Sequence, residues 1–192
     1  MAGDKNLKKR PKAGPSRIQQ DICNANVIRN LAVKDNDMVH IAETEELTIT
    51  ELPSGNISVP LSIWQNHKDE LSKRDQKVAV QIAADEEPID LAEDLGQLEI
   101  IVLPFVTYVD GRSYSHAYKL RTQLGFQGEI RAVGDVHFDQ LDFLKRVGCD
   151  AFELPDSDNQ QAALAAFKEF SKTYQPSADA GRLVFSQRRA VH

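Results

Sequence analysis

The feature that most constrains the fold of this chain is a regular alternation of strand-like and helix-like segments between residues 77 and 186. The segment 98–105, LEIIVLPF, is an almost continuous apolar run, which is typical of a strand buried on both faces of a parallel sheet. Alternation of this kind favours right-handed βαβ units. We therefore predict an α/β fold with a mostly parallel sheet built from successive βα units.

The predicted elements follow from apolar periodicity and from the glycines and prolines between them. The predicted strands are 77–83, 98–105, 129–133, 150–154 and 182–187, and the predicted helices are 88–95, 115–124, 139–147 and 159–174. Gly96, Gly125 and Gly148 are expected to end the first three helices. An eight-stranded barrel needs about 250 residues, and this chain has 192. We therefore expect either an open sheet or a partial barrel.

Residues 31–59 precede this repeat and are predicted to form a small antiparallel element. The segments MVHIA and LTITEL are strand-like, and the turn at 53–56 is expected to reverse the chain into a third strand, ISV. Pro60 then opens a predicted helix, in which Trp64 is expected to anchor the core. Residues 18–192 are accordingly expected to form a single α/β domain.

The first 17 residues form a basic tail, with six Lys or Arg against one Asp. The formal charge of −6 therefore combines a tail of +5 with a body of −11. We expect residues 1–17 to be a disordered, solvated extension. The alternative, a nucleic-acid or nuclear-import patch, rests on the run KKRPK alone, and the acidic body argues against nucleic acid as the main partner.

The sequence also limits the expected cellular setting. No apolar run approaches the roughly 18 residues of a membrane-spanning helix, so no membrane partner is expected. Cys23 and Cys149 lie far apart, without the spacing of a zinc, iron–sulfur or disulfide site, which suits a reducing cytoplasm. The five histidines form no metal-binding motif, and no metal is expected.

The polar residues most able to form a site follow the second predicted strand of the repeat. Ligands of such sheets bind at the carboxyl ends of strands, and Asp110, Arg112, Ser113 and Ser115 lie on the longest of these loops. One interpretation is a site for a charged ligand, with a helix N-terminus suited to an anion. The other is a turn at Asp110-Gly111, with a serine capping the helix and Arg112 paired with an acid. The residues alone leave both interpretations open.

Two charged residues lie within predicted strands. Arg131 and Glu153 occupy positions that should be apolar in buried parallel strands. A buried charge without a partner costs several kcal/mol, so Arg131 is expected to pair with Glu153, Asp150 or Asp110. Asp135 follows the strand of Arg131. The arginines at 112 and 131 and the aspartates at 110 and 135 are predicted to converge at one rim, either as a ligand site or as a salt-bridge network.

The sequence contains no motif for a common cofactor. The glycine-rich fingerprints of dinucleotide and nucleotide sites are absent, and so is the G-x-S-x-G elbow of hydrolases. Cys149 would lie at the amino-terminal end of a strand, which is the wrong end for a nucleophile. We therefore expect no cofactor, and the sequence assigns no catalytic residue.

Residues 110–154 resemble the bacterial domain of unknown function 934 family, and the resemblance extends from about residue 31 to residue 190. It is carried by these motifs: Asp110-Gly111-Arg112, Tyr114-Ser115, Leu120-Arg121, Gly128-Glu129, Arg131-Ala132, Gly134-Asp135-Val136, Asp139-Gln140 and Asp150-Ala151-Phe152-Glu153. Against the family pattern, glutamine, leucine, arginine and phenylalanine are usual where this chain has His116, His137, Phe138 and Cys149.

The resemblance implies a pathway and no defined reaction. Members of the family are described as oxidoreductases of sulfite reduction, because their genes commonly neighbour the gene of the sulfite reductase haemoprotein. It implies first an accessory protein of assimilatory sulfite reduction, in the cytoplasm, that binds or assists the haemoprotein. The alternative is a small-molecule enzyme or an anion sensor that binds a sulfur oxyanion or a phosphorylated metabolite. The candidate ligand-binding or partner-binding residues are Asp110, Arg112, Tyr114, Ser115, Arg131, Asp135, Gln140 and Glu153.

Overall fold

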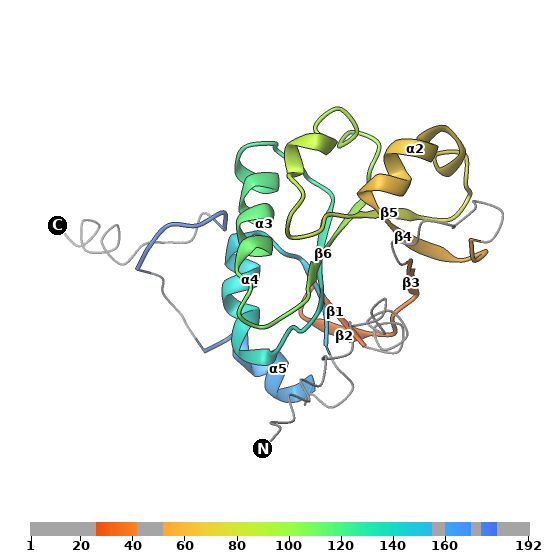
Figure 1. The fold of residues 1–192 in the computed structure, drawn as a ribbon. Coiled ribbons are helices and arrows are strands. Elements are labelled where there is room, and N and C mark those ends of the chain that lie inside the picture. Colours follow the sequence, from red (N-terminus) through yellow and green to blue (C-terminus); the bar gives the residue numbers. More distant parts are fainter. Residues whose placement is uncertain (1–25, 42–51, 155–159, 170–173, 180–192) are drawn as a thin grey trace, which may run out of the picture.

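The computed structural model describes residues 26–41, 52–154, 160–169 and 174–179, whose fold is shown in Figure 1. Within these residues, eight strands form one mixed sheet in the order β2-β1-β8-β7-β6-β5-β4-β3. Neighbouring strands from β3 to β8 are parallel, and β1 pairs antiparallel with both β2 and β8. The strands are β1 (Val27–Arg29), β2 (Ala32–Lys34), β3 (Met38–His40), β4 (Asn56–Pro60), β5 (Val78–Gln81), β6 (Ile100–Phe105), β7 (Glu129–Gly134) and β8 (Ala151–Glu153). The predicted α/β fold with a mostly parallel sheet is confirmed.

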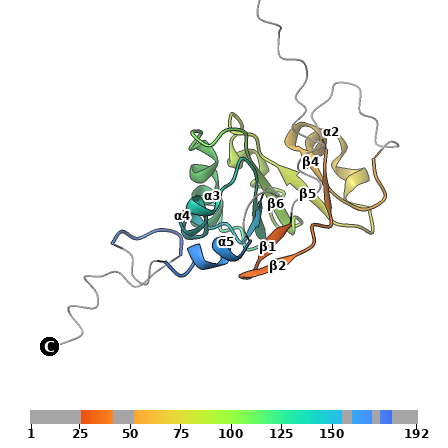
Figure 2. The same ribbon diagram turned by 90° about the horizontal axis from the view of Figure 1, so that it is seen from below.

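The helices pack on one face of this sheet. They are α2 (Leu61–Leu71), α3 (Arg112–Thr122), α4 (Leu141–Val147) and α5 (Gln160–Ala166), with the 3₁₀ helices η2 (Pro88–Leu91) and η3 (Phe138–Gln140). Figures 1 and 2 show α3, α4 and α5 grouped together, with α2 beside β4 and β5. The helices and the strand residues that face them share one apolar core, in which Trp64 is buried as predicted. The opposite face of the sheet carries a smaller apolar cluster around Val102 and Val133.

The sheet is curled into a partial barrel, with the helices outside. In a flat sheet β3 and β8 would lie five strand spacings apart, which is about 24 Å. Yet His40 Nε2 on β3 lies 2.9 Å from Glu153 Oε2 on β8. The two edge strands, β2 and β3, are joined only by residues 35–37, so their ends lie within about 14 Å of each other. The inner face of the curled sheet is therefore a narrow interior.

The N-terminal strands differ from the predicted antiparallel element at 31–59. The antiparallel pair is the hairpin of β1 and β2, whereas β3 and β4 pair in parallel. The connection between β3 and β4, residues 41–55, is long enough for the crossover that parallel strands require. The turn at 53–56 therefore leads into β4 without reversing the chain onto β3.

The helix boundaries agree in part with the sequence. Gly125 and Gly148 end their helices with φ of 66° and 117°, in the left-handed region as expected of C-terminal glycines. α3 begins at Arg112, three residues before the predicted start, and α5 ends at Ala166. The basic tail, most of the LTITEL segment and the predicted strand 182–187 lie outside the described residues. None of the described helices is long and apolar enough to cross a membrane.

Candidate functional site

The loops that follow β6 and β7 lie together at the carboxyl edge of the sheet. Asp135 joins them, because its Oδ2 accepts a hydrogen bond from the backbone N–H of Tyr108 at 2.7 Å and its own N–H donates to Phe105 O at 2.8 Å. The Tyr108 hydroxyl donates to Asp139 Oδ2 at 2.7 Å. Asp135 thus holds a long exposed loop in a fixed position.

Asp110 and Arg112 form a closed pair at the start of α3. The backbone N–H of Arg112 donates to Asp110 Oδ1 at 3.1 Å, and the guanidinium Nη2 donates to Asp110 Oδ2 at 2.7 Å. These hydrogen bonds lower the pKa of Asp110 to about 2. Gly111, the N-cap residue, has an ordinary φ of −88°. The geometry therefore fits the turn and ion-pair interpretation of this stretch.

The predicted serine cap on α3 is wrong. Ser113 is buried, and its hydroxyl donates to Pro104 O at 2.9 Å, which ties the helix to the end of β6. Ser115 lies exposed within the first turns of the helix. Neither serine caps α3; the side chain that bonds its N-terminus is that of Asp110, which accepts the N–H of Arg112.

Tyr114 and Gln140 have structural roles at the same edge of the sheet. The Tyr114 ring lies between those of Phe105 and Phe143, with centroids 5.1 and 5.3 Å away, and burial raises its pKa to about 12. The side chain of Gln140 accepts the backbone N–H of His137 at 3.0 Å, and the His137 ring accepts the backbone N–H of Gln140. His137 Nε2 also lies 2.9 Å from Asp135 Oδ1. This imidazole is therefore held in a helix-capping role.

Around these residues the molecule exposes apolar side chains in an unusual concentration. We call them the apolar rim: Val106, Tyr108, Val109, Phe138 and Phe143. Val109 is 88% exposed and the other four are about half exposed. The acids Asp110, Asp135, Asp139 and Asp142 lie beside them in sequence or by hydrogen bond.

Arg131 and Glu153 do not lie at this rim. Both point to the inner face of the sheet, where Arg131 is 0% exposed and its Nη1 donates to Glu153 Oε1 at 2.9 Å. Arg131 Nε also donates to Glu129 Oε1 at 2.9 Å, and Glu129 pairs with Arg29. The predicted pairing of Arg131 with Glu153 is confirmed. The predicted convergence of Arg131 with Arg112, Asp110 and Asp135 is wrong, because Arg131 lies three residues before the end of β7 and faces inward.

The inner network continues through residues that the sequence analysis missed. The second Glu153 oxygen lies 2.9 Å from His40 Nε2, and His40 Nδ1 lies 2.6 Å from Ser58 Oγ. Ser58 Oγ accepts a hydrogen bond from Gln81 Nε2 at 2.9 Å. These residues come from β3, β4, β5 and β8, and their alternation with outward apolar residues was the only sequence signal for them.

The order of hydroxyl, imidazole and carboxylate in this network is also that of a nucleophilic triad. A triad must expose its nucleophile to a substrate, whereas Ser58 is 0% exposed. Buried charges of this kind are costly unless each is paired. The network therefore acts as an internal framework that joins the two sides of the curled sheet.

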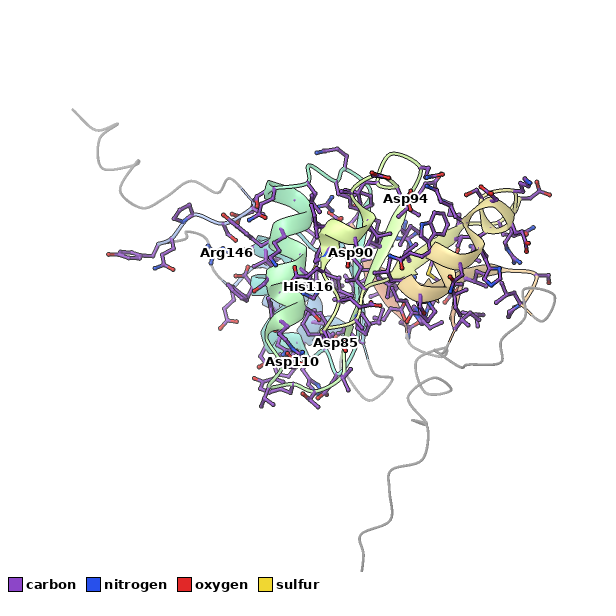
Figure 3. All side chains as sticks on the ribbon, turned by 45° about the horizontal axis from the view of Figure 1, so that its top comes forward. Asp85, Asp90, Asp94, Asp110, His116 and Arg146 are labelled. Carbon is purple, nitrogen blue, oxygen red and sulfur yellow. The ribbon has the colours of Figure 1, made fainter. Side chains whose placement is uncertain are left out.

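His116 is a further buried polar residue near the carboxyl edge. Figure 3 shows it on α3, with Asp85 and Asp110 toward one end of the helix. It is 4% exposed, and its Nδ1 has no hydrogen-bond partner among the described residues. Burial lowers the pKa of His116, with a smaller opposing effect of Glu87.

We expect His116 to make the stability pH-dependent on the acid side. Its lowered pKa means that the unfolded chain binds the proton more tightly, so its contribution to stability is complete above about pH 6.5 and is lost as the pH falls below that value. His116→Gln should remove this part of the slope. Urea unfolding of both proteins between about pH 7.5 and pH 5 measures the difference. Parallel curves would contradict the assignment.

Comparisons with known proteins identify a family but no activity. The model of the family described as "Bacterial protein of unknown function (DUF934)" matches residues 79–185. No curated protein matches the chain. Among the described residues, no group of three or more His, Cys, Asp or Glu could hold a metal ion.

Proposed function

This chain belongs to the family of bacterial proteins of unknown function DUF934, and we propose that it is an accessory protein of assimilatory sulfite reduction. In this proposal it docks on the sulfite reductase haemoprotein through the apolar rim. The resemblance to a family whose genes commonly neighbour that of the haemoprotein supports the choice of partner. The exposed apolar rim is the structural observation that supports docking.

The apolar rim has the composition of a protein interface. Contiguous exposed apolar groups mark interaction surfaces, and Tyr and Phe are enriched in interface cores. Tyr108 is also held in place by Asp135 and Asp139, so binding would cost less conformational entropy than for a free loop. The acids around the rim favour a partner with basic residues around an apolar recess.

The alternative, an enzyme or anion sensor, is less favoured by the arrangement of the arginines. An anion site built on Arg112 and Arg131, as the sequence predicted, would need their guanidinium groups to be free. Arg112 is neutralised by Asp110, and Arg131 is enclosed by Glu129 and Glu153 on the inner face. A thermal-shift screen with sulfite, sulfate and phosphate tests this alternative directly.

Val109→Asp is expected to abolish docking while leaving the fold intact. At 88% exposure the side chain contributes little to the core, but a carboxylate placed in an apolar interface would lose its hydration without gaining a partner. Binding to the purified haemoprotein, measured by calorimetry, should weaken by at least about thirtyfold.

Ile89→Asp is the matched control, because Ile89 is an exposed apolar residue on η2 outside the apolar rim. It should bind the haemoprotein with the affinity of the wild type. The affinities of the wild type and of Ile89→Asp should both fall as the salt concentration rises. The docking proposal fails if the wild type does not bind, or if the two variants bind equally.

A further inference from the structure

An open cavity of about 540 Å³ lies at the opposite end of the strands from the apolar rim. We call it the hairpin cavity. It is formed where the tip of the β1–β2 hairpin meets residues 148–150, which connect α4 to β8, Phe152 on β8, and residues 178–179. Arg146, labelled in Figure 3, fixes the last wall, since its Nη2 donates to Gln175 O at 2.7 Å and its Nε lies 3.5 Å from Asp179 Oδ2. The volume is within the range of small-molecule sites.

The hairpin tip places an apolar side chain at this cavity under backbone strain. Asn30 and Leu31 connect β1 to β2 and have φ of 55° and 58°. A two-residue hairpin of this type favours asparagine followed by glycine. Leucine is unfavourable in the left-handed region, because its Cβ atom crowds the following carbonyl oxygen. Leu31 is nevertheless 50% exposed and lines the cavity, so about half of its surface is not used in packing against the fold. Strain of this kind is typical of functional positions.

The rest of the wall combines apolar groups with one available cation. Cys149 and Phe152 form an apolar wall with Leu31, and burial raises the pKa of the Cys149 thiol, which keeps it uncharged. The Arg121 guanidinium donates to Gly148 O, Phe126 O and Gly128 O and pairs with Asp150.

Lys145, in contrast, is exposed, and the described residues give it no ion-pair partner. Its Nζ lies 5.7 Å from the centre of the Phe167 ring, which orients the ammonium group without neutralising it. Asp179, the other acid at the cavity besides Asp150, is engaged by Arg146. The cavity therefore offers an apolar wall with one unneutralised positive charge at its edge.

We propose that the hairpin cavity binds a small aliphatic carboxylate, whose chain packs on Leu31, Cys149 and Phe152 and whose carboxylate pairs with Lys145. An apolar chain would pack against the apolar wall to which Leu31 contributes. A carboxylate supplies the acidic partner that Lys145 does not have among the described residues. The site is independent of the apolar rim and of the proposed docking.

Calorimetric titration of the full chain with octanoate tests the proposal. The wild type should bind octanoate saturably. The affinities for 1-octanol and octylamine should be at least about tenfold lower, because neither compound carries a negative charge. Lys145→Gln should weaken octanoate binding by about tenfold. Lys73→Gln, which changes an exposed lysine away from the cavity, should leave the affinity unchanged.

Leu31→Gly separates a binding role from a structural one. Glycine relieves the left-handed strain, so the melting temperature should stay the same or rise, while octanoate affinity falls by several fold. A merely structural leucine would leave the affinity unchanged on substitution. Three results would overturn the proposal: no saturable binding of octanoate by the wild type, equal binding of octylamine, or an unchanged affinity in both Lys145→Gln and Leu31→Gly.

Discussion

Replacing Arg131 with methionine is expected to destabilise the fold by about 3 to 5 kcal/mol, the cost of breaking a buried ion pair by removing one partner. Arg131 is fully buried and pairs with both Glu153 and Glu129. Methionine fills much of the same volume, so the loss is mainly electrostatic. Glu153, whose side chain is 1% exposed, would keep His40 as its partner but lose the guanidinium of Arg131.

Urea unfolding followed by circular dichroism measures this effect. Arg112→Met is the matched control, because Arg112 belongs to an exposed pair with Asp110, and such pairs contribute about 0 to 1 kcal/mol. Combining Arg131→Met with Glu153→Gln should restore part of the lost stability, since the second change removes the stranded charge. Equal unfolding midpoints for Arg131→Met and the wild type would show that the ion pairs of Arg131 do not contribute this stability.

The repeat region was predictable because its signals are local. The apolar run of β6 and the glycines that end α3 and α4 each lie within a few residues of the structure they specify. Strong local patterns of this kind are sufficient for element type and for the mostly parallel sheet. The pairing of Arg131 with Glu153 was predictable for a related reason, because β7 and β8 are consecutive parallel neighbours.

The inner network was not predictable in full because its contacts are distant in sequence. His40 and Glu153 are 113 residues apart, and their approach depends on how far the sheet curls. The strand pattern does not determine that curl. The short link between β2 and β3 draws the sheet edges together, but its effect is visible only once the strand order is known.

The error about Arg131 arose because a residue's position along its strand was taken as sufficient to place its side chain at the carboxyl edge. Arg131 and Asp135 are four residues apart, and both were assigned to the carboxyl edge. Arg131, however, lies within β7 and points inward, whereas Asp135 lies beyond its end and bonds the neighbouring loop. The site residues therefore divide into two groups: an internal framework around Arg131 and Glu153, and an exposed edge around Asp110 and Asp135.

Gly134, the last residue of β7, lies between Arg131 of the first group and Asp135 of the second. Gly134 has a φ of 96°, and a Cβ atom there would lie 2.5 Å from the backbone oxygen of Phe105 on β6. The next residue, Asp135, donates its N–H to that same oxygen at 2.8 Å. The close approach of the two backbones therefore positions the carboxylate that holds the loop of Tyr108.

Gly134→Ala is accordingly expected to destabilise the protein by about 2 to 5 kcal/mol, from left-handed strain together with overpacking against β6, whose backbone would have to be pushed away from β7. The expanded β6–β7 spacing should also release Asp135 from Tyr108, so docking on the haemoprotein should weaken even at temperatures where the variant stays folded. Gly111→Ala is the control, since Gly111 has a negative φ and open space around it. Unfolding midpoints and calorimetric binding of both variants measure the two effects. A Gly134→Ala protein as stable as Gly111→Ala would mean that β6 and β7 can separate freely, and Gly134 would then have no part in positioning the rim.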